Sequence, residues 1–192
     1  MNRKNTINDG ACFNGGMVFP VKMIAPNGEA TYPQIMLNNN EEVQEALNKL
    51  LWEEAEKYIR LYLRGKADLA YNVIRKDSKL LTIQLISGKD TFVHHNINII
   101  PGEKKKTELK DILDVKSKDL VELLNVLNNN SKITWDSKLT NEWYTREDNL
   151  YLMKNVNGID EVSGYDINNL TRYIKHKNFL PGNEENKKAK KS

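Results

Sequence analysis

Residues 38–65 read NNNEEVQEALNKLLWEEAEKYIRLYLRG and contain the longest helical pattern in the chain. Apolar side chains recur every three or four residues over about five turns, which is the period of a helix with one buried face. The asparagines at 38–40 can cap this helix, and the carboxylates of Glu41 and Glu42 suit the positive end of its dipole. The sequence therefore predicts a long amphipathic helix that ends near Gly65.

Two partly alternating segments precede this helix, at residues 17–24 and 30–36. Asn27 and Gly28 lie between them and can supply the positive φ angles that a tight hairpin needs. Each segment contains a proline, which cannot donate to a strand ladder and so favours an edge position. The pattern predicts a β-hairpin at the start of the fold.

Three segments with a period of two follow the helix, at residues 69–74, 80–86 and 91–100, and they predict an antiparallel meander. Alternation in the third segment gives it two faces. One face carries Val93, His95, Ile97 and Ile99, and the other carries His94, Asn96 and Asn98.

The remaining part of the chain predicts shorter elements. We expect a short helix through Leu113 that Thr107 can cap, and a second helix after Ser117 that the asparagines at 128–130 end. A hairpin is expected over 142–153, and Asp166 can cap a last short helix. The fold class is therefore α+β: an N-terminal hairpin, a three-strand meander and a C-terminal hairpin packed against one long helix, with two or three shorter helices.

The length of 192 residues suits one domain with loose ends. We expect a flexible, polar and glycine-rich lead-in at residues 1–16. A single α+β domain is expected over 17–180, followed by a disordered lysine-rich tail over 181–192.

Charge and hydropathy restrict the kinds of partner. The formal net charge is +3, and residues 184–192 hold four lysines and two glutamates, so the rest of the chain is nearly neutral. Nucleic-acid binding usually needs a clustered basic face, and we expect none here. No apolar run approaches the length of a membrane span, and no export signal is evident at the N-terminus. Localisation and oligomeric state are left open.

Several short strings, taken in order, resemble a bacterial cell-envelope domain of unknown function. This domain occurs in RsiV-type lysozyme-responsive anti-sigma factors and beside PdaC-type peptidoglycan deacetylases. The strings are YPQI at 32–35, Gln44 and Asn48 in the long helix, HNINI at 95–99 and ELKDIL at 108–113. The resemblance covers roughly residues 17–175 and implies an extracytoplasmic location and a role in binding or sensing.

The histidines and the cysteine do not form a recognisable metal site. His94 and His95 are neighbours on a predicted strand, so their side chains point to opposite faces and cannot chelate one ion together. We expect His95 to be buried or half-buried and His94 to be exposed. His176 has no second ligand nearby in sequence, and Cys12 is the single cysteine, so no metal, cofactor or internal disulfide is expected.

Carboxylate pairs offer weak candidates for acid–base chemistry. Glu53 and Glu56 lie on the long helix, and Asp111 and Asp114 lie after the meander. Catalysis needs two such groups in one pocket with separated pKa values, and spacing along a solvated face does not establish this. We therefore predict no catalytic residues, although enzymatic activity is left open.

Aromatic residues gather in the C-terminal third, at Trp135, Trp143, Tyr144 and Tyr151. Such rings can anchor a protein partner or stack on a sugar, and core packing is the competing explanation. We predict these four as ligand-binding residues of a non-enzymatic binding or sensing module with a protein or cell-wall glycan ligand. The alternatives are an accessory domain that assists a peptidoglycan-modifying enzyme and an unrecognised hydrolase.

Overall fold

The computed structural model describes residues 11–13, 16–25, 28–136 and 138–176. The chain divides into two compact units, Met1–Lys106 and Thr107–Ser192. The expected tail at 181–192 lies outside the described residues, as does most of the expected lead-in. Whether residues 17–180 fold as one domain stays a prediction, because a compact unit is not by itself an independent folding unit.

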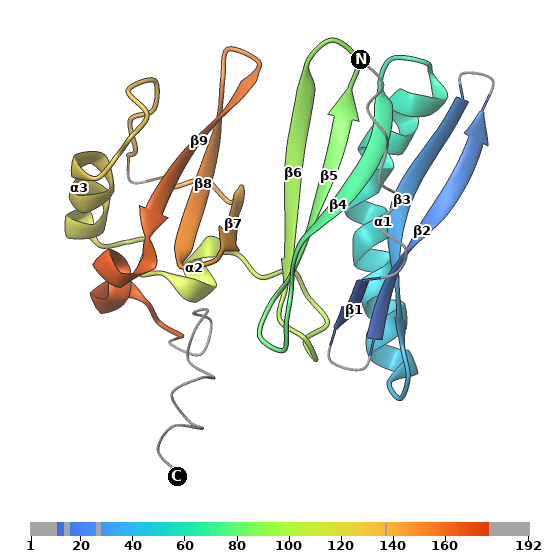
Figure 1. The fold of residues 1–192 in the computed structure, drawn as a ribbon, viewed down its shortest axis with the longest axis horizontal. Coiled ribbons are helices and arrows are strands. Elements are labelled where there is room, and N and C mark those ends of the chain that lie inside the picture. The colour runs from blue at the N-terminus through green and yellow to red at the C-terminus, as the bar shows by residue number, and fades with distance from the viewer. Residues whose placement is uncertain (1–10, 14–15, 26–27, 137, 177–192) are drawn as a thin grey trace. The chain divides into compact units, whose positions relative to one another are not determined.

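The described part of the first unit has two three-stranded antiparallel sheets and a long helix (Figure 1). The strands of the first sheet, in spatial order, are β1 (Ala11–Phe13), β2 (Gly16–Ala25) and β3 (Gly28–Leu37). The second sheet consists of β4 (Asp68–Lys76), β5 (Leu81–Gly88) and β6 (Phe92–Ile99), and the helix is α1 (Glu41–Leu63). The predicted hairpin, long helix and meander are confirmed.

Helix α1 begins and packs as its sequence predicts. The Asn40 side chain accepts a hydrogen bond from the Val43 amide at 3.2 Å, which satisfies one of the unpaired donors at the helix start. The buried stripe of the helix belongs to one apolar cluster with strands β2 to β6. Members of this cluster include Val18, Ile35, Leu47, Leu51, Ile59, Ile83, Leu85 and Ile97.

Two side chains of α1 bond directly to the backbone of strand β3. Asn48 Oδ1 accepts from the Ile35 amide at 2.7 Å, and Asn48 Nδ2 donates to the Ile35 carbonyl at 2.9 Å. Gln44 Oε1 accepts from the Leu37 amide at 2.7 Å. Strand β3 is an edge strand of its sheet, so no further strand of that sheet pairs with its outer backbone groups. The bonds from α1 satisfy these groups instead. They also fix the position of the helix along the strand.

The face of the meander that carries Asn96 and Asn98 is polar and yet largely buried. Asn96 and Asn98 are fully buried in β6. Thr82 Oγ1 donates to Asn98 Oδ1 at 2.7 Å, and Gln84 Nε2 donates to Asn96 Oδ1 at 3.1 Å. These residues are direct cross-strand partners, so a ladder of side-chain hydrogen bonds offsets the cost of burying the amides.

The described part of the second unit holds one three-stranded antiparallel sheet and short helices (Figure 1). The sheet contains β7 (Trp143–Arg146), β8 (Asn149–Val156) and β9 (Ile159–Asp166). The helices are α2 (Leu109–Ile112), α3 (Lys118–Val126) and the 3-10 helix η1 (Ile167–Tyr173). None of the helices in the described residues has the length and apolar character to cross a membrane.

The C-terminal hairpin is present, but it is the first part of a larger meander. Strand β9 was not predicted, because Asp160 and Glu161 dilute the apolar alternation that marks a strand. A local signal was nevertheless present: Asn157 and Gly158, with φ of 54° and 84°, form the turn that joins β8 to β9. Asn-Gly is a strong short-range indicator of a hairpin.

Among the shorter helices, the predicted Thr107 cap is wrong and the predicted Asp166 cap is confirmed. Helix α2 is capped by Glu108 rather than Thr107: the Glu108 amide donates to Asp111 Oδ2 at 2.9 Å in a reciprocal capping arrangement. The Asp111 carboxylate, at the third position of the helix, thus satisfies the backbone amide of Glu108. Ser117 and Asp166 accept the capping hydrogen bonds of α3 and η1.

Candidate ligand-binding site

The structure places the four predicted aromatic residues in two different environments of the second unit. Trp135 and Trp143 are buried, whereas Tyr144 and Tyr151 are half-buried. Tyr144 on β7 pairs in register with Tyr151 on β8, and their rings stack with centroids 4.7 Å apart and planes 10° apart. The two tyrosines therefore form one aromatic surface to which the tryptophans do not contribute.

The two tryptophans belong to the interior of the second unit. Trp135 Nε1 donates to the Tyr165 hydroxyl, and the Trp135 backbone exchanges hydrogen bonds of 2.8 and 2.9 Å with the Asn125 side chain. Trp143 is fully buried and lies opposite Leu152 on β8. These contacts fit the core-packing explanation for both indoles, and their ligand-binding role stays a prediction.

The position of the Tyr151 ring depends on a glycine in the next strand. Tyr151 pairs with Gly164 on β9, and a β-carbon built on Gly164 would lie 2.9 Å from Tyr151 Cε1. The absence of a side chain at position 164 thus gives the ring room to lie across β9. Burial raises the pKa of the Tyr144 phenol, and the neighbouring Tyr151 raises it further. This hydroxyl therefore stays protonated near neutral pH.

A second candidate is a charged cluster between α1 and the strand β6. His95 Nε2 contacts Glu54 Oε2, and Lys106 Nζ donates to Glu54 Oε1 at 3.2 Å. The Tyr58 ring lies 6.0 Å from the His95 ring, centroid to centroid. The hydrogen bond from His95 and the charges of Lys106 and His95 outweigh burial and lower the pKa of Glu54 to about 2.

The histidine predictions have different outcomes. His95 is buried, as expected, with 8% of its surface exposed. His94 is half-buried rather than exposed, because the second face of β6 is also largely buried. The sequence did not identify Glu54 as the partner of His95, since the two residues are 41 positions apart and only the packing of α1 on the sheet brings them together.

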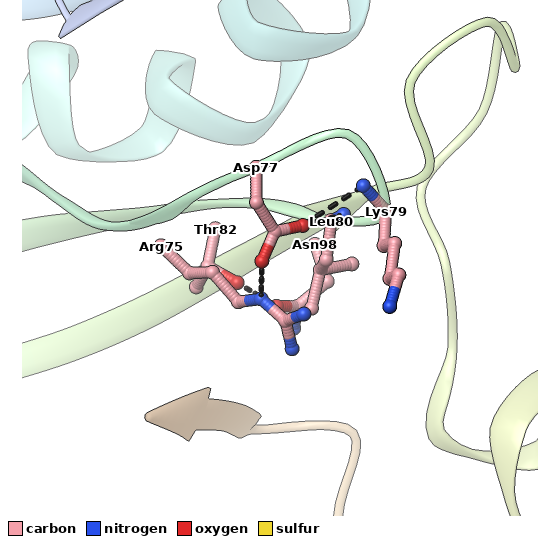
Figure 2. A network of polar contacts seen from close by, with 6 residues as sticks. All are labelled: Arg75, Asp77, Lys79, Leu80, Thr82 and Asn98. Atoms are coloured by element: carbon pink, nitrogen blue, oxygen red, sulfur yellow. Dashed lines mark hydrogen bonds and ion pairs between the residues drawn. The ribbon is translucent and has the colours of Figure 1, made fainter. Parts of the chain in front are cut away.

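A third candidate is the polar network at the β4–β5 turn (Figure 2). Arg75 Nε donates to Asp77 Oδ2 at 2.6 Å, and the amides of Lys79 and Leu80 both donate to Asp77 Oδ1 at 2.8 Å. Burial would raise the pKa of Asp77, but these hydrogen bonds and the Arg75 charge lower it overall. Asp77 therefore closes the turn and also orients the largely buried Arg75 side chain.

Three of the four carboxylates in the pairs found in the sequence have separate structural partners. Glu53 Oε1 lies 3.9 Å from Lys49 Nζ, and Glu56 Oε1 lies 2.7 Å from Arg60 Nη2. The Asp111 side chain accepts from the backbone amide at the start of α2. Within the described ranges, no group of three or more His, Cys, Asp or Glu side chains is placed to hold a metal ion. The Cys12 side chain lies outside what the structure describes.

Comparison with known proteins connects this fold to a domain of unknown function. No protein-family model matches the sequence, and no curated protein matches it. A DUF3298 family member from Bacteroides fragilis is similar over 84% of this chain and 93% of its own, with a TM-score of 0.61 and 12% identity. A DUF3298 family protein from Pseudomonas aeruginosa PAO1 is similar over 87% of this chain and 96% of its own, with a TM-score of 0.60 and 13% identity.

These similarities show the fold and not the activity, because the sequence identities are low. The chain has the α+β antiparallel architecture of DUF3298 structures, and this supports the coarse part of the expected resemblance, a domain of unknown function.

Proposed function

We propose that the chain is a binding or sensing domain of the bacterial cell-envelope type, which recognises a protein or glycan ligand through the face of the β7–β8–β9 sheet that carries Tyr144 and Tyr151. The stacked, half-buried tyrosine pair is the observation that carries the proposal. The shared fold with DUF3298 proteins and the order of the short sequence strings support a domain of this class.

The geometry of the tyrosine pair suits binding in two ways. Each tyrosine offers a large amphipathic surface and has only two side-chain torsions to immobilise, so little conformational entropy is lost when a ligand binds. Stacking with Tyr144 and contact with Gly164 hold the Tyr151 ring in place before a ligand arrives. Pre-organisation of this kind increases affinity because less ordering remains to be done on binding.

Sedimentation with isolated bacterial cell walls, together with a pull-down on immobilised lysozyme, tests the proposal. The Tyr144→Ala/Tyr151→Ala double variant should lose at least about tenfold in apparent affinity for the ligand that the wild type binds. Phe92→Ala removes a ring that is 39% exposed in the first unit and serves as the matched control. Equal retention of the double variant and the wild type would contradict the proposal.

A further inference from the structure

We propose that the ligand of this sheet face is a neutral linear glycan, which stacks on the tyrosines and hydrogen-bonds to a row of polar side chains beside them. The inference rests on the proposed function, because it names the chemistry of the ligand for the same face. We call this surface the tyrosine face; its residues are Tyr144, Tyr151, Gly164, Arg146, Asn149 and Asp166.

Strand register places these residues in two parallel rows. The aromatic row crosses the sheet as Tyr144, Tyr151 and Gly164. The polar row crosses it as Arg146, Asn149 and Asp166. Residues two positions apart on a strand share one face of the sheet and are about 7 Å apart, so the two rows lie side by side on the same face.

The polar row can reach a ligand that lies on the rings. Arg146 and Asp166 are exposed, and Asn149 is half-buried. The Asp166 carboxylate is held by the amide of Asn168, which donates to Oδ1 at 2.8 Å, so its orientation is set before a ligand binds. Together the row supplies guanidinium donors, carboxylate acceptors and an amide that does both.

This combination matches the chemistry of a sugar. A pyranose ring has a face of C–H groups that packs on an aromatic ring, and a rim of hydroxyl groups that donate and accept hydrogen bonds. Because the aromatic row lies directly beside the polar row, one or two sugar residues can make both types of contact at once. The buried centre of a protein–protein interface is instead mostly apolar, and its polar groups gather at the rim.

Charge on the tyrosine face favours an uncharged glycan. Arg146 and Asp166 carry opposite charges on the same polar row, so they largely cancel. For a polyanionic chain, such as a sulfated or uronic-acid polymer, repulsion from Asp166 would offset the attraction to Arg146. A neutral chain needs only the hydrogen bonds, which both residues can supply.

Isothermal titration calorimetry with a panel of neutral hexasaccharides, including chitohexaose and cellohexaose, tests the inference, with a heparin hexasaccharide as the anionic comparator. We expect at least one neutral hexasaccharide to bind in preference to heparin. Tyr151→Ala should weaken that binding by about tenfold and Asn149→Ala by about three- to tenfold, as expected for losing a stacking surface or a hydrogen bond. Tyr151→Phe keeps the ring and should bind within about threefold of the wild type.

Matched controls separate the effects of the tyrosine face from general damage. Phe92→Ala and Asn72→Ala alter an exposed ring and an exposed asparagine of the first unit and should leave binding unchanged. Thermal melting of each variant checks folding, and Tyr151→Phe provides a folded reference if Tyr151→Ala is unstable.

The outcomes distinguish the glycan inference from the proposed function. Failure of every neutral hexasaccharide to bind at millimolar concentration, or binding that Tyr151→Ala and Asn149→Ala leave unchanged, overturns the glycan inference. The proposed function survives that result if the double tyrosine variant still loses retention on a protein ligand. Preference for the heparin hexasaccharide would show that the ligand is anionic and would also overturn the inference.

Discussion

The ring of Tyr151 occupies the space that a side chain at position 164 would need. A β-carbon on Gly164 would lie 2.9 Å from Tyr151 Cε1 and 3.3 Å from Cδ1, closer than unstrained packing permits. The conformation of the tyrosine pair is therefore set in part by a residue that has no side chain. This dependence can be tested without altering either tyrosine.

We predict that Gly164→Ala displaces the Tyr151 ring and weakens its stacking on Tyr144, at a cost of about 1 kcal/mol in the free energy of unfolding. The ring-current shifts of both tyrosines in NMR spectra report the displacement, and urea denaturation reports the stability. In a double-mutant cycle, Tyr151→Ala removes the clashing partner, so Gly164→Ala should then cost little or nothing. Additive effects would show that the alanine acts elsewhere.

Asn48 should be important for the stability of the first unit. Asn48→Ala removes two hydrogen bonds to the Ile35 backbone and leaves a partly buried amide and carbonyl without these partners. We expect a loss of about 2 kcal/mol in urea denaturation. Asn72→Ala alters an exposed asparagine in β4 and should change stability by less than about 0.5 kcal/mol. Similar values for the two variants would refute a structural role for the Asn48 bonds.

Glu54 should make the protein sensitive to acid. Because its pKa is lowered from 4.5 to about 2, its stabilising contribution is present above pH 4.5 and is lost as the pH falls towards 2. That difference corresponds to about 3 kcal/mol, which partial solvent exposure reduces to about 1–2 kcal/mol. Glu54→Gln should therefore be less stable than the wild type at pH 5–7 and nearly equal to it close to pH 2.

Thermal or urea unfolding across this pH range measures the effect of Glu54. Glu53→Gln changes the preceding, exposed glutamate on α1 and is the control, with a difference from the wild type that stays small across the range. A stability difference between the wild type and Glu54→Gln that is constant from pH 7 to pH 2 would show that the charge of Glu54 is not responsible.

Asp77 should stabilise the β4–β5 turn through both its charge and its geometry. Asp77→Asn can keep the acceptor for the Lys79 and Leu80 amides but loses the charged bond to Arg75, whereas Asp77→Ala loses all of them. We expect losses of about 1 kcal/mol for the asparagine and about 2 kcal/mol for the alanine in urea denaturation. Asp90→Ala, at an exposed position, should be close to neutral. No loss for Asp77→Asn would mean that the charge contributes nothing, and equal losses for both Asp77 variants would mean that the bonds to the Lys79 and Leu80 amides contribute nothing.

The sequence was informative wherever a signal is local. The apolar period of α1, its Asn40 cap and the alternation in the meander depend on neighbouring residues, and all appear in the structure. Strand β9 had little apolar alternation and was missed, although the Asn-Gly turn before it was visible. The capping role of Glu108 was missed because a glutamate is less typical of that position than the threonine beside it.

The candidate site was predicted only in part for a similar reason. Aromatic composition pointed to four residues, but it does not distinguish a ring on the surface from a ring in the core, and the two tryptophans are buried. The stacking of Tyr144 with Tyr151 depends on strand register, and the room for Tyr151 depends on Gly164 in another strand.

By itself, the sequence determined the α+β class, the long helix and most of the strands, because these follow from periodicity and caps within a few residues. Only the tertiary structure decided which distant residues meet: Glu54 with His95, Asn48 with the β3 backbone, and Tyr151 with Gly164. Such contacts depend on register and packing between segments, and the side-chain pattern of one segment does not encode where its partner lies.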